Sequence, residues 1–205
     1  RGAGDLAGGV LAAIHISGFR VLALESENPS AIRRTVAFGE AVRLGHCSIE
    51  GIEARLITKE QAAEFIVSDN CEPSADSKAN RLSFIPIAVD PAGELISELQ
   101  PAAVVDAIIA KKNCGTRLDM APLVIALGPG FTAGKDAHIV IETMRGHNLA
   151  RLIYKGEVLP NTGVPGLVGG ESALRVIHAP AEGTLRVIHD IGSSVTRGEV
   201  IARII

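Results

Sequence analysis

The chain has 205 residues, of which 47% are hydrophobic, 20 are basic and 23 are acidic, giving a net charge of −3. A chain of this size can bury a substantial core, and its mixed charges argue against a surface for nucleic acid or an anionic membrane. The sequence has no apolar run of about 18 residues and no signal peptide pattern, so we expect a cytoplasmic protein without membrane contact. Cys47, Cys71 and Cys114 form no CxxC pair, which argues against a disulfide framework or a thiolate zinc site.

The first part of the chain alternates helical and strand-like patterns. Apolar residues recur every four positions from Leu6 to Ile14 and predict a helix that ends at Gly18. Residues 20–25 then predict a strand buried on both faces, and residues 31–45 predict a second helix. Helices and strands in this alternation indicate an α/β fold with a parallel sheet.

The alternation continues through the middle of the chain. Residues 49–57 predict a third strand, and Thr58 and Gln61 have the capping-box spacing that begins a helix. The polar stretch 71–81 predicts a loop. Two later apolar runs, at residues 102–113 and 123–131, predict further buried strands or a strand with a short helical tail.

Composition changes near residue 132, where short β-branched runs separated by turns replace helical periodicity. We therefore predict a Rossmann-like α/β domain over residues 1–131 and a mostly β region over residues 132–205. Residues 178–205 resemble half of a biotinyl/lipoyl-type barrel-sandwich. Such domains carry their prosthetic group on a lysine, and no lysine follows Lys155, so we expect a structural copy whose further strands follow Ile205.

Gly2, Gly4 and Ala7 match the G-x-G-x-x-[G/A] spacing of dinucleotide-binding turns. In such turns the glycines bring the main chain close to a pyrophosphate, which lies at the N-terminus of the next helix. Glu25 closes the next strand, where an acid accepts ribose hydroxyls. The motif predicts a nucleotide site, and a tight turn without a ligand is the alternative.

Asp5 lies inside the predicted phosphate loop, where its carboxylate would repel a pyrophosphate. It fits there if a cation intervenes or if its side chain caps the following helix. Arg33 and Arg34 lie beyond Glu25, where an arginine can meet a 2′-phosphate or face solvent on a helix. Because a turn of this kind leaves from a strand, we also expect residues to precede Arg1.

Gly128 and Gly130 form a second glycine cluster directly after a predicted strand. Ligands of parallel sheets bind at the carboxyl ends of the strands, so both glycine clusters are expected to face one crevice. Pro129, between the two glycines, removes one N–H donor.

Two lysines beside Cys114, at positions 111 and 112, raise the hypothesis of a reactive thiol.

Polar residues follow the second cluster. Asp136, His138 and Glu142 are separated by even steps, so on one strand they would share a face and, with Arg145, form a polar site. A metal site is the weaker alternative, and scattered structural side chains are another. The sequence indicates no catalytic residue and no metal.

Five stretches together resemble one family: RGAGDLAGGV, IRRTVAFGEAV, VVDAIIAKKN, VIALGPGFTAGKDAHIVIETMRGHNLARLIY and NTGVPG. They are similar to the selenium-dependent molybdenum hydroxylase accessory proteins, the YqeB-type family, related in role to the XdhC/CoxI maturation factors. The resemblance implies a bacterial cytoplasmic factor whose partner is a molybdenum hydroxylase. Carried over by position, it assigns Gly2, Gly4 and Asp5 to a nucleotide loop. It assigns a second site to Gly128, Gly130, Asp136, His138 and Arg145.

Three functions therefore stand open. The first is a maturation factor that binds a nucleotide or a molybdopterin dinucleotide at the glycine loops. The second is an NAD(P)-dependent oxidoreductase, although the tyrosine, Tyr154, is followed directly by Lys155 and forms no Tyr-x-x-x-Lys pair. The third is a non-enzymatic scaffold, and a homo-oligomer is compatible with each of them.

Overall fold

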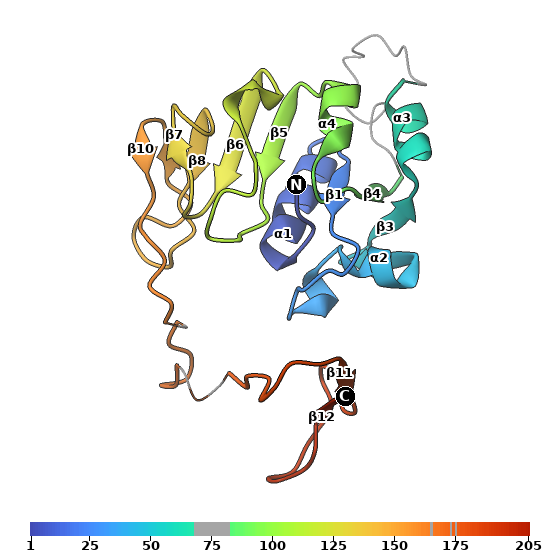
Figure 1. Ribbon diagram of the computed structural model, residues 1–205, viewed down its shortest axis with the longest axis vertical. Coiled ribbons are helices and arrows are strands. Elements are labelled where there is room, and N and C mark those ends of the chain that lie inside the picture. The colour runs from blue at the N-terminus through green and yellow to red at the C-terminus, as the bar shows by residue number, and fades with distance from the viewer. Residues whose placement is uncertain (68–82, 165, 173, 175) are drawn as a thin grey trace. The chain divides into compact units, whose positions relative to one another are not determined.

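The computed structural model describes residues 1–67, 83–164, 166–172, 174 and 176–205. The described chain divides into two compact units, Arg1–Asn161 (unit 1) and Thr162–Ile205 (unit 2), which are coloured blue to orange and orange to red in Figure 1. The predicted loop 71–81, together with Cys71, lies outside the described residues.

Unit 1 contains two four-stranded sheets, each with three parallel strands and one antiparallel edge strand. The strands of the first sheet, in spatial order, are β1 (Ala23–Glu25), β4 (Ile85–Val89), β3 (Ile52–Ile57) and the antiparallel β2 (His46–Ile49). Those of the second sheet are β5 (Ala103–Asp106), β6 (Leu123–Leu127), β8 (Ile139–Ile141) and the antiparallel β9 (Leu152–Ile153). Beside it, β7 (Thr132–Ala133) pairs with β10 (Gly156–Glu157), and no closed barrel forms among the described residues.

The main chain of the first two residues joins these two sheets. The Gly2 nitrogen donates to the carbonyl of Leu24 in β1 at 2.8 Å, and the Arg1 nitrogen donates to that of Val105 in β5 at 2.8 Å. The nitrogen of Ala107 donates back to the Arg1 carbonyl at 2.9 Å, which is the bonding pattern of parallel strands. In Figure 1 the N-terminus accordingly lies between β5 and β1.

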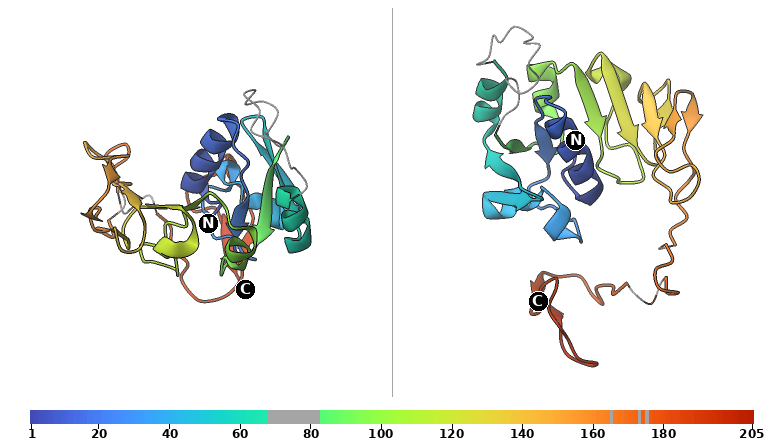
Figure 2. Two further views of the ribbon diagram at one scale, coloured as in Figure 1. Left: turned by 90° about the horizontal axis from the view of Figure 1, so that it is seen from above. Right: turned by 180° about the vertical axis from the view of Figure 1, so that it is seen from behind.

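Helices cover both faces of the strands, as Figure 2 shows for α1 and α3. Successive residues of a strand point to opposite faces. In β1, Ala23 packs with α1 and α2, whereas Leu24 packs with α3 and α4. The helices are α1 (Asp5–Ile16), α2 (Glu40–Leu44), α3 (Lys59–Val67), α4 (Glu94–Leu99) and the 3-10 turns η1 (Arg34–Val36) and η2 (Leu118–Met120). The core therefore consists of two aliphatic layers, one on each face of the parallel strands.

The capping box that begins α3 is confirmed. The Thr58 nitrogen donates to Oε1 of Gln61 at 3.0 Å, and the Gln61 nitrogen donates to Oγ1 of Thr58 at 3.2 Å. The single helix predicted over residues 31–45 is wrong, because the chain turns between η1 and α2. There the Gly39 nitrogen donates to the Ala3 carbonyl at 2.8 Å, and Phe38 is buried. This contact draws the segment onto the N-terminal turn and interrupts the helix.

Unit 2 contains the antiparallel hairpin β11 (Leu185–Val187) and β12 (Ala202–Ile204), which are the strands in its described part. Gly183, Gly192 and Gly198 in this unit adopt positive φ. The composition change near residue 132 falls within unit 1, where β6 pairs with β8. Throughout the described part of the chain, each helix is too short or too polar to cross a bilayer.

Candidate functional site

The first two glycines of the N-terminal motif differ in what surrounds them. Gly2 has a φ of +89°, and a Cβ atom on it would lie 2.9 Å from the main chain of Ile108, so only glycine fits. Gly4 has a φ of −67°, which any residue can adopt. A Cβ atom on Gly4 would meet only the Cβ of Ala31, at 4.0 Å. Neither packing nor φ explains glycine at position 4, and its open side leaves room for a ligand.

Helix α1 begins directly after this turn. Gly4 is its N-cap residue and has no side chain to bond the free amides of the first turn. Ala7 is 1% exposed and packs against Ala107 and Leu127, which brings the helix close to the second sheet. The turn therefore presents uncapped N–H groups at the positive end of a helix.

Asp5 forms an ion pair with Arg33. Its Oδ1 also accepts the Leu6 nitrogen at 2.9 Å, a local contact rather than a helix cap. Arg33 is therefore the cation that compensates the Asp5 carboxylate in the predicted phosphate loop. Arg34 lies in η1.

Glu25 lies beside the turn at the end of β1. Its Oε2 accepts the nitrogen of Ala3 at 2.7 Å, and its Oε1 accepts the nitrogen of Ser26 at 2.6 Å and the hydroxyl at 3.0 Å. The carboxylate thus holds the glycine turn against β1. Because a carboxylate has about four acceptor positions, it retains capacity for a further hydroxyl.

Three other parallel strands also end in an acid that folds back onto its own loop. Sequence analysis did not single out Asp90 and Asp106, although the runs IAVD, VVD and IVIE all end as LALE does. Each acid accepts main-chain N–H groups and so fixes the loop that follows its strand. The donors are Gly93 (3.1 Å) and Leu95 (2.8 Å) for Asp90, Ile108 (3.1 Å) for Asp106, and Met144 and Leu159 (each 2.8 Å) for Glu142.

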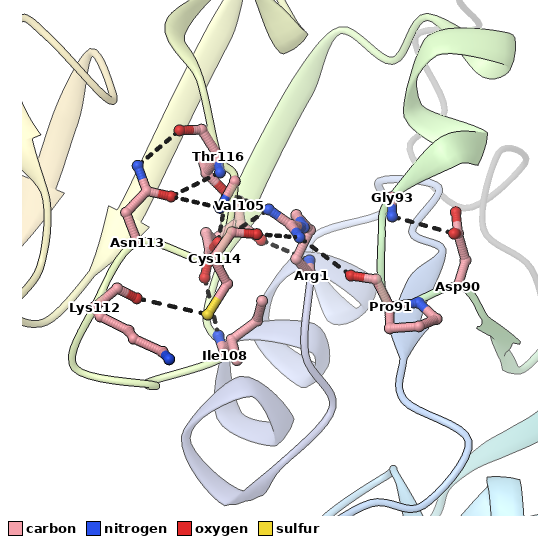
Figure 3. Close-up of polar contacts among 12 residues, drawn as sticks. Arg1, Asp90, Pro91, Gly93, Val105, Ile108, Lys112, Asn113, Cys114 and Thr116 are labelled. Atoms are coloured by element: carbon pink, nitrogen blue, oxygen red, sulfur yellow. Dashed lines mark hydrogen bonds and ion pairs between the residues drawn. The ribbon is translucent and has the colours of Figure 1, made fainter.

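Arg1 connects this edge of the sheet to the loop after β5 (Figure 3). Its side chain is 2% exposed, and Nη1 lies 3.6 Å from Oδ2 of Asp106. Nη1 donates to the Thr116 hydroxyl at 2.6 Å, and this hydroxyl donates to Asp106 at 2.5 Å. Nη2 donates to the carbonyls of Cys114 at 2.9 Å and Pro91 at 3.2 Å. A buried cation that donates three hydrogen bonds therefore anchors the loop to the N-terminal turn.

Residues 107–116, the lysine loop, are held in one conformation. Oδ1 of Asn113 accepts the nitrogens of Gly115 at 2.9 Å and Thr116 at 2.7 Å, and Nδ2 donates to the Thr116 carbonyl at 2.8 Å. Ile109 and Lys111 have φ values of 59° and 62°, in the left-handed region that disfavours side chains. The loop is both anchored and strained.

The second glycine cluster packs against the same loop. Gly130 has a φ of +105°, and a Cβ atom on it would lie 2.5 Å from Cα of Lys112. Gly128 has a φ of +79°, and its nitrogen donates to the carbonyl of Ile141 at 2.9 Å. Gly2 and Gly130 thus contact the lysine loop at Ile108 and Lys112, so the loop lies between the two glycine clusters.

The predicted polar face of Asp136, His138 and Glu142 is wrong, because only Ile139–Ile141 form the strand. Chain reversal at Gly134, with φ +86°, puts the first two residues in a turn before β8. Glu142 lies after β8, at the opposite end of the strand.

Each of these side chains bonds its own surroundings. Oδ2 of Asp136 accepts the Thr132 nitrogen at 2.8 Å, and Nδ1 of His138 accepts the Val124 nitrogen at 2.9 Å. Arg145 is exposed. Among the described residues, no three His, Cys, Asp or Glu side chains lie close enough to hold a metal ion.

Over 202 residues the chain is 51% identical to an Escherichia coli (strain K12) protein named "Uncharacterized protein YqeB". The match covers 98% of this chain. The chain is homologous to YqeB. It spans 35% of the length of that relative. No family model matches the sequence, and no solved structure matches it.

The similarity to YqeB bears out the YqeB part of the resemblance that the five sequence stretches indicated, and the role in hydroxylase maturation stays a prediction. Because it covers 98% of the chain, the region shared with YqeB extends through the glycine turn, the lysine loop and the hairpin of unit 2. The name of YqeB assigns it no activity, so the role of the candidate site is argued from its chemistry.

Gly4 lines neither of two further cavities, although Gly2 and Ala7 of its motif line the second. One of about 740 Å³ lies between α4 and η2, where Arg117 pairs with Asp119 at 3.0 Å. The other, of about 460 Å³, has a mainly aliphatic lining between α1 and the second sheet that includes Val10, Ile14 and Val105. An aliphatic lining offers few partners for a phosphate, so the glycine turn remains the better anion site.

Proposed function

We propose that this chain binds the phosphate groups of a nucleotide at the turn Gly2–Asp5. We further propose that it serves as an accessory factor in the maturation of selenium-dependent molybdenum hydroxylases, with a molybdopterin dinucleotide as the ligand. The observation that carries the binding proposal is the open side of Gly4 at the uncapped N-terminus of α1.

The strand order supports the position of this site. The main chain of residues 1 and 2 hydrogen-bonds to β1 on one side and to β5 on the other. The strands that follow the turn first lie on the β1 side of this segment, and the later strands lie on its β5 side. This arrangement favours a Rossmann-like description, and ligands of such sheets bind where the strand order reverses. We propose the Rossmann-like description for unit 1 on this basis.

The charges at the turn also favour an anion. The Asp5 carboxylate pairs with Arg33, and Glu25 accepts N–H groups from Ala3 and Ser26. Apart from the Leu6 nitrogen, which donates to Asp5, the first-turn amides of α1 remain for the ligand, and a helix N-terminus favours negative charge. A phosphate at this position would meet donors rather than an uncompensated carboxylate.

The maturation role is supported by the sequence resemblance. For unit 2, we propose half of a biotinyl/lipoyl-type sandwich, supported by the hairpin β11–β12 and its glycine turns. Affinity capture with the full-length protein from selenium-replete cells is expected to recover a molybdenum hydroxylase. Unchanged hydroxylase activity in a deletion strain, together with no recovery, would contradict the role.

Calorimetric titration tests the binding site. We expect micromolar binding of a cytidine nucleotide, NADH or NADPH, abolished in Gly4→Val because the isopropyl group fills the ligand's space. Gly9→Val is the matched control, since Gly9 also lies in the N-terminal half of α1 and a Cβ atom on it meets nothing within 4 Å. Binding that survives Gly4→Val, or no binding by the unmodified protein, would overturn the proposal.

A second candidate function is an NAD(P)-dependent oxidoreductase. Glu25 favours it, because its carboxylate lies beside the turn and can accept a ribose hydroxyl. In that case Glu25→Gln weakens NADH binding more than cytidine nucleotide binding, and the protein oxidises NADH with a substrate from a broad panel. No turnover with any substrate would reject this candidate.

A further inference from the structure

We propose that the lysine loop supplies a second phosphate contact, in which Lys111 and Lys112 bind the distal phosphate of a ligand whose proximal phosphate lies at the Gly4 turn. The ligand class is then a nucleotide with a diphosphate group rather than a monophosphate. This inference rests on the proposed nucleotide site and extends it to a second element.

The position of the lysine loop supports this second contact. The loop contacts both glycine clusters, because the main chain of Ile108 lies against Gly2 and that of Lys112 lies against Gly130. Both contacts are so close that a Cβ atom on either glycine would overlap the loop main chain. Figure 3 shows the Lys112 side chain running from the loop toward Ile108, the residue packed on the Gly2 turn. The loop that carries both lysines therefore packs directly on the turn that contains the proposed phosphate site.

The charges of the two lysines also support this second contact. Lys111 and Lys112 are exposed, and within the described part of the chain neither ammonium group pairs with a carboxylate. The nearby acid Asp106 is buried and already engaged by Arg1 and Thr116. Two adjacent cations without an acidic partner give this edge a local positive charge.

The anchored conformation of the loop is the third argument. Arg1, Asp106 and Asn113 fix the loop main chain, while Lys111 holds a left-handed φ of 62°. Strained positions persist only where their surroundings impose them, and they concentrate at binding sites. A fixed main chain also lowers the entropy lost when the lysine side chains engage a ligand. A lysine ammonium binds phosphate as a point charge and needs no planar geometry.

The test compares nucleoside monophosphates with diphosphates by calorimetry on the full-length protein, using CMP, CDP, AMP and ADP. We expect the double variant Lys111→Gln/Lys112→Gln to lose about 10- to 100-fold in affinity for the diphosphates, as for loss of a charge-assisted contact. Affinity for the monophosphates is expected to change by less than about threefold, since they reach only the turn. Lys135→Gln, at an exposed lysine before β8, is the matched control and is expected to leave all four affinities unchanged.

The outcomes separate this inference from the proposed function. Diphosphate affinity that Gly4→Val abolishes but the double lysine variant leaves intact would overturn the inference while the nucleotide site stands. Equal loss of monophosphate and diphosphate affinity in the lysine variant would also overturn it, because the lysines would then act on the turn itself. Failure of the unmodified protein to bind any of the four nucleotides would reject the underlying site. A lower dependence of CDP affinity on salt in the lysine variant would support the inference further.

Discussion

At the scale of single residues, glycine occupies positions where the main chain approaches another segment closely. Elsewhere, residues with full side chains adopt positive φ and are strained. Gly2 and Gly130 allow the lysine loop to pack against the two turns. Lys111 adopts a comparable left-handed φ with a full side chain, at a cost on the order of 1–3 kcal/mol. This cost is understandable if the ammonium group has a role that glycine cannot fill.

Replacing Lys111 with glycine separates stability from binding. We expect Lys111→Gly to raise the free energy of unfolding by about 1 kcal/mol, because glycine adopts positive φ without strain, and to weaken diphosphate binding about tenfold. Urea denaturation and calorimetry measure the two effects. Lys135→Gly serves as control, since Lys135 does not have a positive φ, and it is expected to lower stability slightly. A Lys111→Gly protein less stable than the unmodified one would show that the side chain stabilises the loop.

The sequence indicated some residues of the site and missed others for definable reasons. Gly4 and Glu25 follow from local spacing, so both were found in the first 25 residues. The ion pair of Asp5 with Arg33 depends on where η1 lies, which follows from the contact between Gly39 and Ala3. Such long-range contacts leave no periodic signal in the sequence.

At the scale of elements, length decided what could be predicted. The strands β1, β3, β5 and β6 and the helix α3 have clear apolar runs or caps and were found. The six-residue α4 gives less than two turns of periodicity and was missed, as was the hairpin β2–β3 with its turn at Glu50 and Gly51. The predicted polar face failed because β8 has only 3 residues.

The capping box of α3 allows a direct measurement at this scale. We expect Thr58→Ala to lower the free energy of unfolding by about 1 kcal/mol, because it removes the acceptor for the Gln61 nitrogen. Gln61→Ala is expected to cost less, since Thr58 still caps the helix. Glu64→Ala, in the same helix but away from the cap, is the control and should be close to neutral. Thermal or urea unfolding gives all three values, and a neutral Thr58→Ala would contradict the capping role.

At the scale of the whole molecule, the two units differ in how much they bury. The buried hydrophobic residues of the described chain run from Ala3 to Val158, all within unit 1. Large apolar side chains of unit 2 are exposed, including Leu185 at 61% and Ile205 at 72%. The change of composition near residue 132 could not locate this division, because short β-branched strands occur on both sides of Asn161.

A shortened chain tests the independence of unit 1. We expect a protein ending at Asn161 to unfold cooperatively, with a free energy within about 1 kcal/mol of the longer chain, because it retains the described core. It should also retain nucleotide binding with unchanged affinity. A molten or aggregated product would mean that unit 2 contributes to the stability of unit 1. Circular dichroism during thermal unfolding distinguishes these results.

The contacts that anchor Arg1 determine when, during synthesis, the proposed nucleotide site can form. Its partners Val105, Cys114 and Thr116 are 104, 113 and 115 positions further along the chain. At a synthesis rate of about 5–20 residues per second, they leave the ribosome on the order of 10 s after Arg1. The glycine turn therefore remains open until the lysine loop has been translated. The proposed nucleotide site can therefore form only after Arg1 meets these distant partners.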